Sequence, residues 1–379
     1  MKKIITKYLL VFVFFLILLE IFSLIFSKLN LLYVNYDPDY IHSYGNNWRT
    51  ENTKWGSWHK KNYTDVHSSK CFNVEYKSNN IGARDNDDYN LDKFQDSILL
   101  IGDSHAEGYG VNFEDTFHQK LQNKITKKIL NFGTAGNFGT VQSYLIYKNL
   151  ASKYKHSEII YFFNPASDFI DNDWNYWKTK VRKFRNRPYF IYDDLNKEYK
   201  IYYPNDNSNK ISIYFKDIIF LKIKPFLLKY TYTANTLRTI NFLISQDQIV
   251  ENTDVTKKKI YSSKNKSYFN NDKLSVNGTI YFIEKFLELA KNKKVTILII
   301  PHKSDLELIS KGNNFKNLNW FKKLKKISKK YNVKLINFTD FVDNKNYKEL
   351  IHTCDDHWNA AGNNFAANIV LDKIPKINP

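Results

Sequence analysis

Five apolar runs of strand length recur from residue 96 onward, and four patterns of helical period lie between or after them. Continuous apolar runs are typical of strands buried on both faces of a parallel sheet. Strands that alternate with helices predict a doubly wound α/β domain with a mostly parallel sheet. The runs are DSILLIGDS (96–104), KKILNFG (127–133), SEIIYFFNP (157–165), KKVTILIIP (293–301) and NVKLINF (332–338), and the helical patterns cover 140–155, 277–293, 314–331 and 359–374.

A longer apolar run at 8–26 has the length that spans a bilayer, and only Glu20 interrupts it. Lysines at positions 2, 3 and 7 precede the run, so the N-terminus is expected in the cytoplasm and the remainder outside it, in the periplasm. No small-residue cleavage pattern follows, which favours an uncleaved signal anchor. Glu20 is expected near the membrane interface or neutral, rather than as a functional intramembrane acid.

These patterns divide the chain into a membrane segment (1–30), a lead-in segment (31–95) and an α/β domain (96–376) with an insertion at about 174–273. The lead-in is expected to form short strands and loops, including an edge strand within 70–85 that turns at Gly82. The insertion combines a hairpin pattern at 187–204 with an amphipathic stretch at 216–244, which Pro225 interrupts. It is interpreted as a lid or docking surface, or as a helical cap packed on the core.

The formal net charge of +19 comes almost entirely from lysine, because only six of the 57 basic residues are arginine. Nucleic-acid binders usually cluster arginine on one face within a recognisable module, and no such module is present in the sequence. Codon bias in an AT-rich genome explains the lysines, and attraction to anionic lipid or acidic polysaccharide is the alternative. No nucleic-acid partner is expected.

Cys71 and Cys354 are the two cysteines of the chain. In an oxidising compartment two cysteines can pair, and this pair would tie the lead-in segment to the loop that carries Asp355. Two buried thiols are the alternative.

Two motifs about 250 residues apart carry the candidate chemistry. GDSHAEGYGV places Ser104 where a buried strand ends, and CDDHWNAAGN places His357 in a loop with acids two and one residues before it, just ahead of the last helix. A serine is a weak nucleophile until a base takes its proton, and an acid orients that base. Asp355 is the preferred acid and Asp356 the alternative.

His105 and His302 are the competing bases, and each is interpreted as a loop histidine. Acyl transfer also needs donors for an oxyanion, and the segment NFGTAGNFGT (131–140) could present the N–H of Gly136. This segment lacks the GxGxxG pattern of dinucleotide sites. The cluster of His352, Asp355, Asp356 and His357 is interpreted as a catalytic loop rather than a zinc site, so no metal or cofactor is expected.

At these motifs the chain resembles the SGNH (GDSL-type) hydrolases, and specifically their membrane-anchored members. The resemblance covers about 79–376 apart from the insertion, and it implies a flavodoxin-like three-layer fold. It implies Ser104 as nucleophile and oxyanion donor, Gly136 as second donor, and His357 with Asp355 as base and acid. In its third block this chain has NPASDFIDN from Asn164, where Ser167 stands at the asparagine position and Asn164 is the alternative donor. NNIGARD (79–85) also resembles a segment of such anchored members.

The resemblance implies a serine esterase or O-acyltransferase that works through an acyl-serine intermediate. By family analogy and anchoring, the expected substrate is an acylated carbohydrate on cell-surface or exported polysaccharide. The enzyme would either remove acetyl groups from it or transfer them to it. Polysaccharide export or acetylation machinery is the expected partner. A lipid esterase at the membrane surface is a second interpretation. A non-catalytic glycan-binding member of an export complex is a third.

Overall fold

A computed structural model describes the chain in two compact units, each held by its own internal contacts. The first unit consists of Met1–Asp37, Ser68–Lys70 and Asn209–Ile260, and the second of Pro38–His67, Cys71–Ser208 and Tyr261–Pro379. The structure describes residues 2–29, 48–52, 54–69, 71–92, 94, 96–136, 138–177, 187–203, 227, 231–234, 236–237, 240, 268–269, 271–342 and 347–373.

The second unit is built on a parallel sheet whose strands match the five predicted apolar runs. They are β5 (Ser97–Gly102), β6 (Lys128–Gly133), β7 (Glu158–Phe163), β10 (Lys294–Ile299) and β11 (Lys334–Asn337), in the order β11-β10-β7-β5-β6. All four neighbouring pairs are parallel. In chain order of these strands this is the flavodoxin-like order 2-1-3-4-5, which confirms the predicted fold class.

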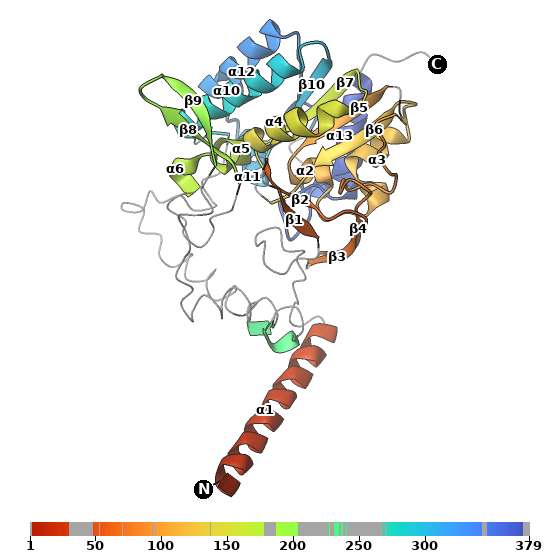
Figure 1. Cartoon of the computed structure of the whole chain (residues 1–379), viewed down its shortest axis with the longest axis vertical. Helices are drawn as coiled ribbons and strands as arrows, with labels where there is room; N and C mark the ends of the chain where they lie inside the picture. Colours follow the sequence, from red (N-terminus) through yellow and green to blue (C-terminus); the bar gives the residue numbers. More distant parts are fainter. Residues whose placement is uncertain are drawn as a thin grey trace. The chain divides into compact units, whose positions relative to one another are not determined.

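Helices cover both faces of the sheet (Figure 1), because successive residues of each strand point to opposite faces. Leu99 and Ile101 of β5 belong to one core, and Ile98 and Leu100 belong to the other. Helices α4 (Thr140–Asn149), α10 (Lys273–Leu289) and α12 (Asn319–Lys330) contribute to the first core, and α3 (Phe117–Gln122), α11 (Lys303–Ser310) and α13 (Ala360–Lys373) to the second.

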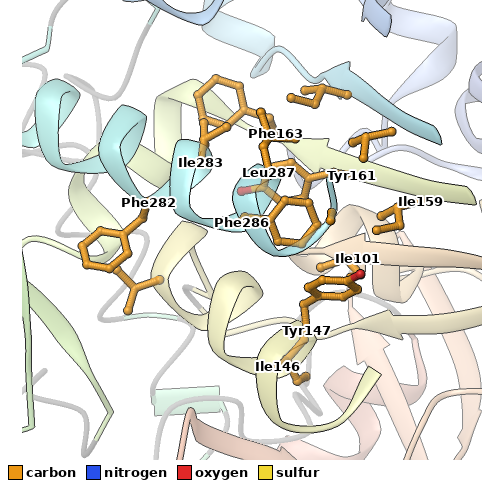
Figure 2. Close-up of a cluster of buried hydrophobic side chains, with 14 of the residues drawn as sticks. Ile101, Ile146, Tyr147, Ile159, Tyr161, Phe163, Phe282, Ile283, Phe286 and Leu287 are labelled. Carbon is orange, nitrogen blue, oxygen red and sulfur yellow. The ribbon is translucent and has the colours of Figure 1, made fainter. Parts of the chain in front are cut away.

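Aromatic side chains fill the first core (Figure 2). Tyr161 of β7 stacks on Phe286 of α10 with ring centroids 5.2 Å apart, and Tyr147 of α4 contacts the same ring at 5.0 Å. Burial of such rings dominates core energetics, so this layer fixes α4 and α10 against the sheet. The carboxyl ends of β5 and β7 are thereby set side by side, at the point where the strand order reverses.

Smaller elements complete the unit. The sheet pairs β1 (Arg49–Asn52) with β2 (Gly56–His59) and β3 (Thr64–Ser69) with β4 (Phe72–Lys77) lie in the predicted lead-in segment, and β8 (Tyr189–Asp193) pairs with β9 (Glu198–Tyr202) as the predicted hairpin. Short helices are α2 (Ser104–Glu107), α5 (Pro165–Asp171) and α6 (Trp174–Trp177), with 3₁₀ turns at Phe113–Asp115, Ala151–Lys153, Phe315–Asn317, Phe338–Asp340 and Tyr347–Leu350.

The first unit contains α1 (Lys2–Lys28), in which Thr6–Phe26 has a mean hydropathy of 3.0 over its best window. By length and composition this helix could cross a membrane. The predicted amphipathic stretch at 216–244 lies largely outside the described residues, and Pro225 is among those left out.

Candidate active site

Ser104 begins α2 one residue after β5, with Asp103 between them as the N-cap, so the serine is presented at the carboxyl edge of the sheet. Two glycines, one at the end of β5 and one at the end of β6, allow the backbone segments around this turn to approach closely. A Cβ on Gly102 would lie 2.6 Å from the Cβ of Phe162, and a Cβ on Gly133 would lie 2.4 Å from the backbone nitrogen of Glu107. Ser104 remains partly exposed although its neighbours are buried, so its hydroxyl is accessible.

His357 and Asp355 complete a hydrogen-bonded relay with this serine. The Oγ of Ser104 lies 2.7 Å from Nε2 of His357, and Nδ1 of the same ring is bonded to Oδ1 of Asp355. That carboxylate oxygen also accepts the backbone N–H of His357 at 2.9 Å. With Nδ1 donating to the acid, Nε2 is the nitrogen left to accept the serine proton. Of the two acids that the sequence left open, Asp355 is the one bonded to the ring.

The charges of the pair favour this arrangement. Burial lowers the pKa of His357, but the Asp355 carboxylate more than offsets it, so the pKa lies above the ordinary value of 6.5. Burial raises the pKa of Asp355, but His357 holds it well below its usual range. The pKa of Asp356 is raised by burial and by the neighbouring charge of Asp355. Asp355 is therefore the ionised acid that stabilises a protonated His357.

Two rings from the first motif contact the imidazole of His357. Tyr109 stacks on it with centroids 4.1 Å apart and planes 24° apart, and the ring of His105 lies 4.9 Å away. His105 is 4% exposed, and burial lowers its pKa despite the neighbouring Asp103. Neither ring was assigned this contact from the sequence, because stacking on a base 250 residues away has no local pattern.

The loop that carries the base is tied to β4. Cys354, the residue before Asp355, forms a disulfide with Cys71, the residue before β4. Within the loop, the N–H of His352 donates to the carbonyl of His357 at 2.9 Å. From the same strand β4, the hydroxyl of Tyr76 accepts the N–H of Gly110 at 2.8 Å. The lead-in segment is thus bonded to both motifs. The sequence suggested such a link only through the two cysteines.

The loop after β6 is bound to the nucleophile's turn through its backbone. The N–H of Thr134 donates to the carbonyl of Gly102 at 3.2 Å, and the N–H of Ala135 donates to the carboxylate of Glu107. The next residue, Gly136, has φ +95°, a conformation that favours glycine. The predicted oxyanion donor therefore follows directly after a backbone group anchored to α2.

Asn164 and Ser167 take different directions after β7. The amide nitrogen of Asn164 lies 3.4 Å from Oδ2 of Asp103, the residue before the nucleophile, and Asn164 is 1% exposed. The hydroxyl of Ser167 instead lies 3.1 Å from Nε2 of His302, beyond β10. The structure therefore brings Asn164 to the serine's turn and directs Ser167 toward His302, the histidine that had been considered as a competing base.

Arg84, within the NNIGARD segment, binds the backbone of the first motif. Its guanidinium donates to the carbonyls of Glu107 at 3.3 Å and Val111 at 2.5 Å, and also to that of Gly108. Burial raises the pKa of the Glu107 carboxyl, but His59 and Arg84 lower it to about 2. No sequence pattern marked a role for Arg84 or Glu107. The scarcity of arginine in this lysine-rich chain was the available signal.

A cleft of about 420 Å³ opens beside the relay. Its lining combines apolar and polar side chains from β4, from the end of the first motif and from the base loop, and it does not include Ser104 or His357. The lining residues are Cys71, Phe72, Asn73, Val74, Gly110, Val111, Asn112, Asp115, Ile351, His352, Thr353, Asn359 and Ala360.

Comparison with solved structures finds proteins of the lipolytic G-D-S-L family at low sequence identity. One is a member of that family from Veillonella parvula, with 12% identity and a TM-score of 0.37 over 74% of this chain and 99% of that one. Another is the lipase/acylhydrolase from Enterococcus faecalis, with 11% identity and a TM-score of 0.36 over 74% and 95%. No protein-family model and no curated protein matches the chain.

Proposed function

We propose that the chain is a serine esterase or O-acyltransferase that works through an acyl-Ser104 intermediate. The observation that carries the proposal is the relay of Ser104, His357 and Asp355, with 2.7 Å between the serine Oγ and Nε2 of His357. The relay spans 253 residues of sequence, so packing against one sheet edge, rather than local chain geometry, brings its members together.

The geometry implies a two-step reaction. Oγ of Ser104 attacks the ester carbonyl while its proton passes to Nε2 of His357, and the imidazolium then protonates the leaving alkoxide. In the second step His357 takes a proton from water or a sugar hydroxyl, whose oxygen attacks the acyl-enzyme. The imidazolium then returns the proton to Oγ as the bond to Ser104 breaks. Water gives hydrolysis and a sugar hydroxyl gives transfer.

Three groups are proposed to stabilise the oxyanion. The N–H of Ser104 lies at the start of α2, where helical N–H groups have no intrahelical acceptor. Gly136 follows the loop residue anchored by Glu107, and Asn164 supplies the side-chain amide in place of Ser167. Such donors are typically worth about 10²- to 10³-fold each in rate.

The proposed enzyme is anchored by α1, with the N-terminus cytoplasmic and the second unit periplasmic, in line with the lysines before the helix. Its proposed substrate is the acetylated form of a cell-surface or exported polysaccharide, handled together with export or acetylation machinery. The mixed aromatic and amide lining of the cleft beside the relay supports a sugar ligand. In this proposal the chain is one of the anchored SGNH members, and the DxHWNAAG last block (355–362) supports that membership.

A fluorophosphonate probe on the purified full chain tests the catalytic step. Wild type and the matched control Asp356→Asn should be labelled, and Ser104→Ala should not. Absence of labelling in folded wild type would contradict catalysis and favour a glycan-binding role. Acetate release from acetylated polysaccharide, compared with p-nitrophenyl esters of increasing chain length, then tests the substrate. Rates that rise with acyl length would favour a lipid esterase.

A further inference from the structure

One face of α1 is covered although the rest of the helix is exposed. Among its described side chains, Leu19, Glu20, Ser23 and Leu24 are partly or fully buried, and all the others are exposed. Their spacing places them on one face of the helix. Within this compact unit, a segment of the insertion lies against that face, since it is hydrogen-bonded to Glu20.

The contact is a helix cap. The carboxylate of Glu20 accepts the N–H groups of Tyr232 at 2.6 Å and Thr233 at 3.1 Å, which begin the helical stretch 232–234. The first N–H groups of a helix have no intrahelical acceptor. The hydroxyl of Thr231 accepts the next one, from Ala234, at 3.3 Å. Glu20 therefore caps a segment 212 residues further along the chain.

The position of Glu20 along α1 determines how deep in a membrane the capped residues 232–234 would lie. The apolar stretch Thr6–Phe26 has 21 residues, so at 1.5 Å per residue it is about 31 Å long, close to the hydrocarbon thickness of a bilayer. Glu20 lies six residues before Phe26, about 9 Å inside the C-terminal end of the stretch. Backbone groups that donate to Glu20 must lie at a similar depth.

The side chains beside the cap are suited to that environment. Leu227, Leu237 and Ile240 are 41%, 61% and 37% exposed, and Leu237 is the most exposed of the three. A charged carboxylate and free N–H groups are both costly in hydrocarbon, and each satisfies the other here. Apolar side chains that are exposed in water but placed at this depth would contact acyl chains instead.

We infer that the described residues of the insertion between Leu227 and Ile240 enter the membrane beside α1, with Glu20 capping them and with Leu237 and Ile240 facing lipid. The side chains of Leu237 and Ile240 would contact the acyl chains of the leaflet at the C-terminal end of α1. The inference rests on the proposed membrane span of α1. It makes these described residues part of a monotopic element rather than of a lid in aqueous solution.

Site-directed spin labelling of the full chain in lipid nanodiscs tests the depth. Both native cysteines are in the disulfide, so a single new cysteine takes the label under non-reducing conditions. Labels replace Leu237, Phe14 on α1 as the lipid reference, and Leu195 in the β8–β9 turn, 94% exposed, as the aqueous reference. The measured quantity is relaxation by oxygen relative to a water-soluble nickel chelate.

The Leu237 label should give a ratio close to that at Phe14 and several-fold above that at Leu195. Glu20→Leu should lower the ratio at Leu237 severalfold while Phe22→Leu, on the exposed face of α1, leaves it unchanged. If the label at Leu237 gives the aqueous ratio of Leu195 while the label at Phe14 gives a lipid ratio, the inference is wrong but α1 still spans the membrane. An aqueous ratio at Phe14 overturns both the membrane span of α1 and the inference that rests on it. Because Leu237 is exposed, its replacement leaves the packing of the unit intact.

Discussion

The turn that carries Ser104 and the loop that carries His357 meet at one edge of the sheet, yet they are held by different means. Residues 105–107 of the turn are at most 4% exposed, and Arg84 and two close glycine contacts fix their backbone. In the loop, the side chains of Asp355 and His357 are 27% and 23% exposed. A disulfide and a stacked tyrosine hold it.

The contrast concerns how much of each region depends on distant residues. The turn is part of the core, so the forces that fold the sheet also place the nucleophile. The loop contributes little to the core beyond Ile351 and Trp358, so the disulfide and hydrogen bonds are expected to position His357. Damage to the turn should therefore cost stability, and damage to the loop should cost activity first.

The largest effect is expected from removing the base. His357→Ala should lower kcat by on the order of 10⁶-fold, and Asp355→Asn by about 10⁴-fold, because each leaves the serine without a correctly oriented proton acceptor. Asp356→Asn is the matched control and should stay near wild type. Steady-state hydrolysis of p-nitrophenyl acetate measures all three, and full activity in His357→Ala would move the base to another histidine.

Replacing the two third-block candidates separates their roles. Asn164→Ala should lower kcat by about 10²- to 10³-fold with little change in KM, because an oxyanion donor acts mainly in the transition state. Ser167→Ala should change kcat little, since its hydroxyl is engaged with His302. The reverse result, with Ser167 the more damaging replacement, would return the donor role to the residue at the family's asparagine position.

Arg84→Met should destabilise the turn that carries Ser104. It leaves buried carbonyls without a donor and Glu107 without a neighbouring cation, so the free energy of unfolding should fall by about 3–5 kcal/mol. Lys285→Met removes an exposed ion pair with Glu288 and should cost at most about 1 kcal/mol. Denaturant titrations compare the two, and equal losses would show that the turn does not depend on Arg84.

Removing the cross-link should affect the loop more than the sheet. The double replacement of Cys71 and Cys354 by serine is expected to cost about 2–4 kcal/mol in unfolding free energy. Below the unfolding transition it should still lower kcat, by up to about 10²-fold, because a displacement of the base by about 1 Å has that effect. Far-ultraviolet circular dichroism should remain unchanged. Unaltered kcat in the folded double variant would show that the stack and hydrogen bonds alone position His357.

The smallest effect is on pH dependence. Because the pKa of His357 is raised above 6.5, the acidic limb of kcat/KM should have its midpoint above that value. Asp356→Asn removes one neighbouring negative charge and should shift the midpoint to lower pH by less than about one unit. The raised pKa stabilises the fold below the unfolded value of 6.5, and this contribution is lost as pH rises through the folded pKa. A midpoint below 6.5 in wild type would contradict this assignment.

The fold was accessible from the sequence because its signal is local. Each apolar run that predicted a strand is a strand, and alternation with helices predicts a parallel sheet without knowledge of any contact. The hairpin at 187–204 followed in the same way from its alternation and turn residues. The serine and histidine motifs were also visible, since residue type and spacing alone mark a nucleophile at a strand end and a base beside an acid.

The choice between near neighbours was not accessible in this way. Asn164 and Ser167 lie in one short segment, and only the start of α5 decides which side chain faces Asp103. Tyr109 and Arg84 act across elements that are distant in sequence, so no local pattern marks them. The contact of Glu20 with Tyr232 and Thr233 also joins residues far apart in sequence, so no local pattern marks it.

The sequence by itself determined the strands and helices, the apolar N-terminal helix, and the residue types for acyl transfer, because periodicity and residue chemistry are properties of contiguous chain. Tertiary structure alone decided that Asp355 rather than Asp356 binds the ring, that Asn164 lies at the nucleophile's turn, and that β4 is joined to both motifs. These outcomes depend on side-chain directions and on hydrogen bonds between segments far apart in sequence, which packing against a common sheet edge establishes.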